Sequence, residues 1–488
     1  MKRLLIYGII AATAALTAGC SAEREGEPDP GPSRPEPFWL SFSVGNIEGS
    51  KGDSQAGNAT SPTYASAKTL AIDNSITTLC AYLIDDNGKV VAAGTASGED
   101  ITPTEKGAKA VVSMLDARKI ARGTRYRLRV VANLPGSTYT SLIANGFSSI
   151  SDADMTYTYP LERYEGAEIT DMTAAQLPEE GMPMSTAPAD EVEVTVPDNG
   201  KEYSTKDTAY EVDTESSGKK IINLTRILAR IDFKSTAADT EKGIPATNTY
   251  TLPDGRFDLE VKALSPVNMA SVCYMVPRIS DGIAECPSPV FKARTGATLP
   301  LTVGARRIVT GMSTTYYTEI EYAAEYMPPK QGVALNSTTG VIVTALLRVN
   351  ANSPQDVKEA FADPEHPSLW YFDDGKYQGI PRAAKPEAVT ANWHEIKYDS
   401  TLEGYPLYYV KSIRHKSEGT SATDGVISDG EYGIIRNTAY RITINSFTLL
   451  PHPWNPTDTP EQGDEGISIT VTVPASWNYH RQVLELGN

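Results

Sequence analysis

The residue whose setting most clearly indicates chemistry is Cys20, which ends the sequence LTAGC at residues 16–20. Two basic residues near the start are followed by residues 4–16, which are apolar or small and carry no charge. Such a pattern is typical of a secretory signal, because a membrane span needs a longer apolar run. A small residue before a cysteine fits lipoprotein processing, in which the thiol is acylated before the signal is cut. We therefore predict a signal peptide over residues 1–19 and a lipid on Cys20, with an ordinary signal peptide and an incidental cysteine as the alternative.

The other residues that could support catalysis do not form a recognised site. The five histidines are spread between positions 366 and 480, and none stands at metal-ligand spacing to another. The sequence contains no metalloprotease, nucleophile-elbow or phosphate-loop motif. His394 and Glu395, beside Trp393, come nearest to a site, and we interpret them as a pair on a strand surface. The prediction is a protein without catalytic residues, metal or cofactor.

Two acidic turns could suggest calcium, at residues 373–375 (DDG) and 424–425 (DG). They lack the dense oxygen-ligand spacing of a calcium loop. We interpret them as turns, in which Asp binds the local backbone and Gly adopts positive φ. A glycosidase that uses two carboxylates stays possible, since an acidic protein offers many pairs, but the sequence selects none of them.

Few cysteines remain beyond Cys20. Cys80 lies in an apolar strand and is predicted to be a buried thiol. Cys273 and Cys286 could form a disulfide in an oxidising compartment, or could stay separate thiols.

Length and charge narrow the class of protein further. With 488 residues the chain is too long for one ordinary core, so two domains are expected. Acidic residues number 61 against 44 basic ones, and the formal net charge is −17. A chain this acidic repels phosphate backbones, and nucleic acid is therefore not expected as a partner. A membrane is expected as a partner only through the lipid anchor.

Short alternating or apolar runs separated by Gly and Pro turns indicate strands along most of the chain, including residues 76–84, 225–233 and 340–349. Asp86-Asn87-Gly88 is predicted to turn the strand at 76–84 into a second strand at 89–93. In the strand at 126–132, the arginines at positions 125, 127 and 129 are predicted to share one face. The pattern predicts an all-β protein with minor helix, built as two tandem β-sandwich domains of transthyretin-like or Greek-key character. A polar stretch at residues 198–219 places the domain boundary near residue 215. After the signal, the predicted parts are a flexible lipidated tether at 20–37, a first strand at 38–51, sandwich domains at 52–215 and 216–450, and a Pro-rich arm with a last strand at 451–488.

The first and last strands each stand beside sequence with loop composition. In the first, Phe38, Leu40, Phe42 and Val44 alternate with polar residues or Trp39; in the last, the alternating apolar residues are Ile467, Ile469, Val471 and Val473. A sandwich whose first strand is cut away would expose a groove with unpaired backbone. An extended segment from a neighbouring molecule could fill such a groove by strand addition.

The chain resembles the type V pilin or fimbrillin family of lipoprotein precursors. The resemblance runs through the LTAGC box and the segments ITTLCAYLIDDNG, YRLRVVANLPG, EEGMPMST, LTRILARIDF and IIRNTAYRITINSF. The tail PHPWNPTDTPEQ followed by ISITVTVPASWNYHRQVLEL is similar to the minor-fimbrillin branch. Each segment is a weak motif alone, and their shared order strengthens the resemblance.

The resemblance implies a mode of assembly. In that family a trypsin-like protease removes the first strand of the exported precursor, and the last strand of one subunit fills the opened groove of another. Carried over, the removed strand contains Phe38, Leu40, Phe42 and Val44. The donor strand contains Ile467, Ile469, Val471 and Val473.

This chain departs from the family at the expected cleavage site. The family's cut follows an arginine, yet no arginine occurs between Arg34 and Arg118. Lys51 is the basic residue after the first strand, so cleavage between Lys51 and Gly52 is predicted. The alternative is an uncut subunit that belongs at a tip or a base.

Three functional hypotheses follow. The leading one is a structural subunit of a surface fimbria, whose partners are copies of itself or other fimbrial subunits and a surface receptor that the sequence does not identify. The first alternative is a surface glycan-binding outer-membrane lipoprotein, which would present exposed aromatic rings and would not depend on its last strand. The second is an outer-membrane glycosidase with two carboxylates at a cleft.

Overall fold

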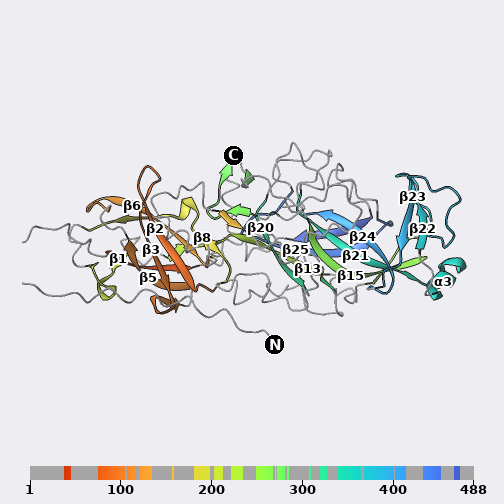
Figure 1. Ribbon diagram of the computed structural model, residues 1–488, viewed down its shortest axis with the longest axis horizontal. Coiled ribbons are helices and arrows are strands. Elements are labelled where there is room, and N and C mark those ends of the chain that lie inside the picture. Colours follow the sequence, from red (N-terminus) through yellow and green to blue (C-terminus); the bar gives the residue numbers. More distant parts are fainter. Residues whose placement is uncertain are drawn as a thin grey trace, which may run out of the picture. The chain divides into compact units, whose positions relative to one another are not determined.

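The computed structural model consists mainly of β-strands along the residues that it describes (Figure 1). The structure describes residues 38–45, 75–104, 107–115, 120–134, 156–158, 181–197, 203–212, 221–234, 249–267, 270, 272–280, 283–284, 307–308, 319–326, 338–363, 368–400, 402–413, 432–451 and 466–472. Within them, strands predominate and helices are short, which confirms the predicted all-β class. None of the described helices is long and apolar enough to cross a membrane.

The first sheet is assembled from strands of residues 38–226, in the order β10-β1-β5-β3-β2-β6-β8-β12, with β4, β9 and β11 pairing beside this path. Their bounds are β1 Phe38–Gly45, β2 Thr78–Ile84, β3 Val90–Ser97, β4 Ile101–Thr104, β5 Gly107–Leu115, β6 Arg125–Ala132, β8 Met184–Ser185, β9 Val192–Thr195, β10 Tyr210–Glu211, β11 Ile221–Asn223 and β12 Thr225–Arg226. The short 3-10 helices η1 Gly98–Asp100, η5 Pro188–Asp190 and η7 Lys206–Thr208 lie between them.

The β2–β3 hairpin shows how local sequence sets this sheet. Asp85 accepts hydrogen bonds on Oδ1 from the backbone N–H groups of Asn87, at 2.9 Å, and Lys89, at 2.8 Å. Gly88 adopts a φ of 77°, which glycine takes at little cost. The turn predicted from Asp86-Asn87-Gly88 is therefore present, and it sets the β2–β3 pairing that runs from Ile84↔Val90 to Thr78↔Ser97.

The remaining sheets are formed mainly by residues after 227. One sheet has the order β20-β13-β25-β26, and another has the order β14-β15-β21-β24 with β19 beside β15. Three two-stranded sheets are β7–β16, β17–β18 and β22–β23. The bounds are β7 Thr156–Thr158, β13 Leu228–Lys234, β14 Thr249–Thr251, β15 Phe257–Val267, β16 Val272–Tyr274, β17 Ile279–Ser280, β18 Ile283–Ala284, β19 Arg307–Ile308, β20 Glu319–Ala324, β21 Gly340–Val349, β22 Ser368–Phe372, β23 Trp393–Lys397, β24 Tyr405–Ser412, β25 Ala439–Phe447 and β26 Ile467–Thr472, with one helix, α3 Gln355–Ala362.

The segment 225–233 differs from the single alternating strand expected there. Thr225 and Arg226 pair with β8 of the first sheet, whereas β13 starts at Leu228 and pairs with β20 and β25. Burial does not alternate, because Ile227, Leu228, Arg230 and Ile231 are all buried. The chain passes from one sheet to another at Ile227, so both of its faces are covered, and period-two burial is lost. The predicted domain boundary near residue 215 falls at undescribed residues and stays a prediction.

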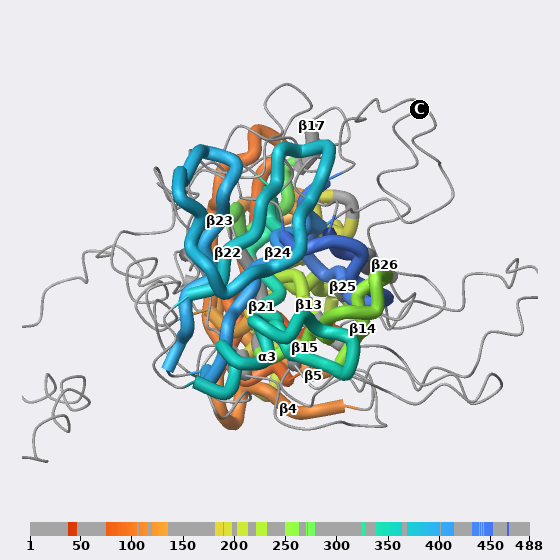
Figure 2. The backbone as a smooth tube through the Cα atoms, turned by 90° about the vertical axis from the view of Figure 1, so that its right-hand side faces the viewer, coloured from red at the N-terminus to blue at the C-terminus, as the bar shows by residue number. Residues whose placement is uncertain are grey.

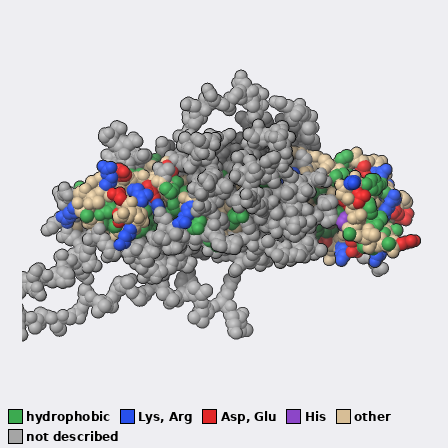
Figure 3. All heavy atoms as spheres, turned by 90° about the horizontal axis from the view of Figure 1, so that it is seen from above, with side chains coloured by type: hydrophobic (Ala, Val, Ile, Leu, Met, Phe, Trp, Pro, Cys, Tyr) green, Lys and Arg blue, Asp and Glu red, His purple; other side chains and the backbone are tan. Residues whose placement is uncertain are grey.

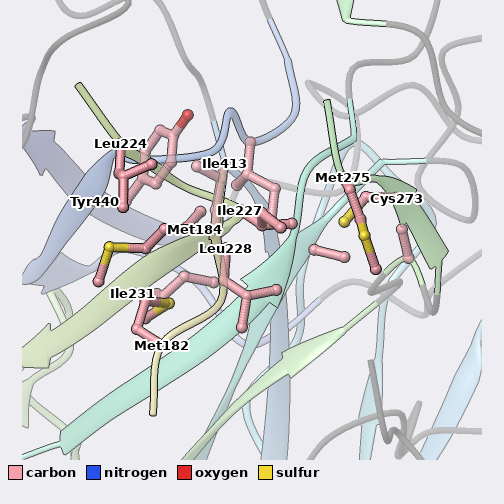
Figure 4. Packing of buried hydrophobic residues seen from close by; sticks show 14 of the residues in the cluster. Met182, Met184, Leu224, Ile227, Leu228, Ile231, Cys273, Met275, Ile413 and Tyr440 are labelled. Carbon is pink, nitrogen blue, oxygen red and sulfur yellow. The ribbon is translucent and has the colours of Figure 1, made fainter. Parts of the chain in front are cut away.

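A buried junction forms around this crossing (Figure 4). Met182, Met184, Ile227 and Leu228 pack there among side chains from β25 and from the β16 region. Arg436 is fully buried, and its Nε donates to Glu325 Oε2 at 2.7 Å. Its two terminal nitrogens donate to the carbonyl oxygens of residues 275, at 2.8 Å, and 274, at 2.5 Å. The guanidinium is thus satisfied by an anion and two carbonyls, which a buried charge requires.

Residues 350–404 form an insertion between two strands that pair directly. β21 and β24 are antiparallel neighbours from Gly340↔Ser412 to Leu347↔Tyr405, a pairing that a short turn can connect. Between them the chain instead forms α3 and the β22–β23 hairpin, which lies next to β24 (Figure 2). The sequence reasoning missed α3, although Val357, Ala360 and Phe361 stand at helical spacing behind Pro354.

Charged side chains of both signs are interspersed over the described parts of the face in Figure 3. Among the described residues, several charged side chains form ion pairs across strands, including Arg125 with Glu193 at 3.0 Å and Arg348 with Glu260 at 2.7 Å. A more buried group joins β6 to the segment before β9, where Glu191 accepts from Arg127, at 2.7 Å, and from Arg129. The alternating arginines predicted in residues 125–129 therefore bind acidic partners beside the neighbouring strand.

Candidate functional site

The first strand, β1, lies inside the first sheet and not at its edge. It pairs antiparallel with β5 over seven positions, from Phe38↔Met114 to Val44↔Ala108. Along its other edge it pairs in parallel with β10 and then with β11. Removing β1 would therefore leave unpaired backbone on β5 at one side and on β10 and β11 at the other. We call the gap between these strands the β1 groove.

The predicted apolar residues of β1 all point into the core. Phe38, Leu40, Phe42 and Val44 have exposed fractions of 6%, 0%, 2% and 1%. The residues of β5 directly opposite them are buried too, namely Met114, Val112, Ala110 and Ala108. The period-two pattern read from the sequence is thus confirmed, and the strand covers one continuous apolar floor.

The outer edge of β1 is closed by backbone that the sequence did not predict. The N–H of Val212 donates to the carbonyl of Ser41 at 2.8 Å, and the N–H of Leu224 donates to the carbonyl of Gly45 at 2.9 Å. The two donors directly follow β10 and β11, which have two and three residues. Strands of two or three residues are too short to show an alternation of apolar and polar side chains. The composition of residues 198–219 therefore indicated only a polar linker.

An aromatic cluster holds the start of β1. The ring of Phe38 lies 6.4 Å from the rings of both Tyr203 and Tyr210, measured between centroids. Tyr203 and Tyr210 contact each other edge to face at 5.2 Å. Edge-to-face and offset pairs at such distances are favourable beyond the area they bury. If β1 leaves, these two tyrosines lose their shared apolar partner.

Two ion pairs lie beside β1, one between the strands on either side of it and one between the short helices η1 and η7. Lys109 of β5 stands opposite Ser43, Glu211 of β10 stands opposite Ser41, and their charged atoms are 3.4 Å apart. Nearby, Lys206 Nζ lies 2.5 Å from Asp100 Oδ1, and this hydrogen bond raises the pKa of Lys206. Both pairs are partly exposed, so each contributes little to stability. They connect the two walls of the groove without using β1 itself.

Gly107 permits the closest approach between β1 and β5. A Cβ at this position would lie 2.1 Å from the carbonyl oxygen of Val44 and 2.6 Å from the Cα of Gly45. Its φ is 151°, a conformation that other residues rarely adopt. The end of the β1 groove therefore depends on the absence of a side chain at Gly107.

The last strand, β26, lies in a different setting. It pairs antiparallel with β25 from Arg441↔Thr472 to Phe447↔Ile467, and no second partner strand is recorded for it among the described residues. Register places Ile469 opposite Ile444 and Val471 opposite Ile442, both of which are buried. In this structure the predicted donor strand thus completes its own sheet as an edge strand. This is the arrangement expected of an ordinary last strand, and equally of a donor before exchange.

Several predicted positions fall outside the described residues: Cys20, Lys51, Gly52 and Val473. Lipidation, cleavage and the end of the donor strand therefore stay predictions. Cys80 is buried as expected, and desolvation raises the pKa of its thiol to about 12. Cys273 is buried in β16, and Cys286 lies outside the described residues.

The candidate catalytic and calcium positions have ordinary structural settings. His394 and Glu395 lie in β23, as predicted, and Glu395 Oε1 accepts from the hydroxyl of Ser368 at 2.5 Å. Asp373 and Asp374 bind backbone N–H groups of residues 375–377, which confirms the turn interpretation and lowers the pKa of Asp374. Within the described residues no group of His, Cys, Asp and Glu side chains could hold a metal.

A known protein family matches the part of the chain that contains β24, β25 and β26. Residues 403–482 match the family described as major fimbrial subunit protein type IV, fimbrillin, C-terminal. Over these residues the chain is similar to the C-terminal region of fimbrillins. The predicted resemblance to fimbrillins is confirmed at this level, whereas the minor-fimbrillin branch stays a prediction.

Among solved structures, the chain is similar to a putative cell adhesion protein from Parabacteroides distasonis, with 14% identity over 91% of this chain and 99% of that one and a TM-score of 0.46. It is similar to a tip fimbrial protein from Porphyromonas gingivalis, with 11% identity over 90% and 99% and a TM-score of 0.42. A fimbrillin from the same organism has 14% identity over 89% and 96% and a TM-score of 0.36. No curated protein sequence matches the chain.

Proposed function

We propose that this fimbrillin-type chain is a structural subunit of a surface fimbria and that its subunits join by donor-strand exchange. The observation that carries the proposal is the position of β1, which is buried and paired along both edges. A strand in this position leaves a ready site for another strand when it is removed, because both the hydrogen-bonding edges and the apolar floor are already formed.

The magnitude of the exchange supports a durable polymer. Four apolar side chains of the kind found in β1 contribute roughly 6–12 kcal/mol gross on burial. A donor strand with the same spacing, Ile467, Ile469, Val471 and Val473, would recover a gain of that order. Ordering of the donor and of the subunits opposes it, while the backbone ladder on both edges adds to it.

The proposal includes the steps that bring the subunit to the surface. The precursor would be exported, acylated at Cys20 and held at an outer membrane, and a trypsin-like protease would cut between Lys51 and Gly52. The mature subunit would begin at Gly52. Its functional residues would act in assembly and not in catalysis. Amino-terminal sequencing of surface filaments tests the cut: a start at Gly52 is expected, and a start at Cys20 would contradict it.

A peptide-binding experiment tests the exchange itself. A synthetic peptide of residues 467–486 should bind the cleaved subunit and raise its melting temperature, and should leave the uncut chain unchanged. A peptide with Val471→Asp should not bind, because a charge in a dry groove is unfavourable by several kcal/mol. Thr470→Asp on the opposite face is the matched control and should still bind. Equal binding of both charged peptides, or binding to the uncut chain, would contradict donor-strand exchange.

A further inference from the structure

Three successive backbone carbonyls at the end of the β25 region accept hydrogen bonds from three different side chains. The hydroxyl of Tyr409 donates to the carbonyl of Leu449 at 3.0 Å. The side-chain amide of Gln378 pairs with Leu450 on both sides, since its Nε2 donates to the carbonyl at 3.0 Å and its Oε1 accepts from the N–H at 2.6 Å. The hydroxyl of Tyr371 donates to the carbonyl of Pro451 at 2.9 Å. We call these three side chains the clasp.

The two tyrosines of the clasp are buried, and Gln378 is half-buried. Tyr371 and Tyr409 are 4% and 3% exposed, and burial raises the pKa of both hydroxyl groups, so both remain neutral donors at physiological pH. Gln378 is itself oriented by a 3.0 Å hydrogen bond from its Nε2 to Asp373 Oδ2. A side-chain amide that pairs with both groups of one residue reproduces a backbone pair, and it fixes position and direction together.

Two members of the clasp come from the insertion at residues 350–404. Tyr371 lies in β22 and Gln378 follows it, whereas Tyr409 lies in β24. The residues they hold stand directly before the segment that leads to β26. The far end of that segment returns to the same place, because the N–H of Thr448 donates to the carbonyl of Gly466 at 2.9 Å. Without the insertion, residues 449–451 would lack two of their three clasp partners, and Tyr409 with Leu449 would be the clasp contact that stays.

We infer that the insertion is the positioning element of the inter-subunit connection, and that its Tyr371 and Gln378, with Tyr409, fix the point from which the donor strand departs. The inference rests on the proposed function. When β26 leaves β25, the contact between Thr448 and Gly466 is lost, whereas the clasp stays closed. The free length therefore begins at Pro451, and the direction in which the next subunit is held is set by the insertion of the donor subunit.

Hydrogen exchange of the uncut full chain tests the clasp before any assembly occurs. In Gln378→Ala the amide of Leu450 should exchange at least about tenfold faster, while the amides of β21 keep their protection. Tyr371→Phe removes one hydroxyl and keeps the ring, and should leave the melting temperature within a few degrees of the parent. Gln355→Ala and Tyr398→Phe are matched controls in the same insertion, at exposed positions that do not contact residues 449–451. They should leave the exchange of Leu450 unchanged.

Filament geometry separates positioning from local stability, because a clasp that only stabilised the fold would not change how successive subunits are oriented. Filaments of Gln378→Ala combined with Tyr371→Phe should form, and electron microscopy should show a persistence length shortened severalfold and a broader spread of subunit rotation. Filaments of the two control variants should match the parent. An unchanged exchange rate at Leu450, or double-variant filaments as straight and regular as the parent, would overturn the inference.

The same set of samples separates this inference from the proposed function. A chain that ends at Gly466 lacks β26 and should not polymerise if strand exchange holds. If that chain polymerises, the donor proposal fails, and the positioning inference fails with it because it rests on that proposal. If it does not polymerise while the clasp variants give parental filaments, the donor proposal stands and the positioning inference alone fails.

Discussion

The two terminal strands of the described chain, β1 and β26, have similar sequence patterns and different structural settings. Each alternates apolar and polar residues over a short run beside loop-like sequence. β1 is enclosed between β5 on one side and β10 and β11 on the other. β26 pairs with β25 at the edge of its sheet, as far as the described residues extend.

The difference lies in what each strand leaves behind. Loss of β1 would unpair two edges and uncover a floor lined by Met114, Val112 and Ala110, so the rest of the sheet would require a replacement. Loss of β26 would unpair one edge of β25. Two strands with similar hydrophobic patterns therefore differ in what their removal would expose. In the proposed exchange, the enclosed strand would leave the acceptor groove, and the edge strand would be the donor.

The largest expected difference concerns single buried leucine and isoleucine residues in the two strands. Leu40→Ala should lower the free energy of unfolding of the uncut chain by about 2–5 kcal/mol, because its side chain is fully buried within an enclosed strand. Ile467→Ala should lower it by less, because an edge strand can shift to close part of the cavity. Urea denaturation of both variants measures this. Equal losses would remove the proposed distinction between the strands.

A smaller effect is expected at the glycine that lets β1 approach β5. Gly107→Ala should destabilise the uncut chain by about 1–3 kcal/mol, since the new methyl group overlaps the carbonyl of Val44. After β1 is removed, the same substitution should have a smaller effect, and comparison of melting temperatures before and after cleavage measures the change. Gly88→Ala is the matched control, with positive φ and open space around it. Its effect should be the same in both forms.

Alkaline pH should destabilise the first sheet through the buried thiol of Cys80 in β2. Burial raises the pKa of this thiol from 9.0 to about 12, so the neutral form is favoured in the folded state. Its contribution to stability is present below pH 9 and is lost as pH rises from 9 to 12; at pH 10 the loss is about 1 kcal/mol.

Cys80→Ala should lessen the loss of stability between pH 8 and pH 10 by that amount, measured by urea denaturation at each pH. Thiol labelling at pH 8 gives an independent check on the two strands. Removal of β1 should accelerate labelling of Cys80, and truncation after Gly466 should not. Faster labelling after the truncation would mean that β26 also supports the first sheet.

The smallest expected effect belongs to the ion pair across β1. A double-mutant cycle of Lys109→Ala and Glu211→Ala should give a coupling of about 0.2–1 kcal/mol, because both side chains are more than 40% exposed. The coupling should weaken at high salt. It should persist after cleavage if the two walls of the groove stay in place, and its disappearance would show that β1 alone holds them together.

Sequence patterns predicted the strands whose apolar residues alternate or form a continuous run, and the turn between two of them. The alternation of Phe38, Leu40, Phe42 and Val44, the Asn87-Gly88 hairpin and the strand at residues 340–349 all follow from local chemistry and are present. The fimbrillin resemblance was carried by such segments, and it is confirmed for residues 403–482.

The rest depends on partners that are distant in the sequence. β10 and β11 have too few residues to show a period, and they become strands only because β1 offers them its edge. The sequence pattern predicted that Ile227 and Leu228 belong to one strand with their neighbours. In the structure the chain passes from one sheet to another at this point. No sequence pattern marked Gln378, and its hydrogen bond to Leu450 joins positions 72 residues apart. No local pattern encodes such a contact.

The buried Arg436 has a consequence for the order in which the chain can fold. Its guanidinium is satisfied by Glu325, 111 residues earlier, and by the carbonyls of Tyr274 and Met275, 162 and 161 residues earlier. Contacts of such sequence separation form slowly, because loop-closure entropy is lost before they are made. The junction around Arg436 should therefore close late in folding, which in the proposed route would follow export of all these segments. Slow closure of this kind would keep the chain unfolded while it crosses a membrane as an extended polymer.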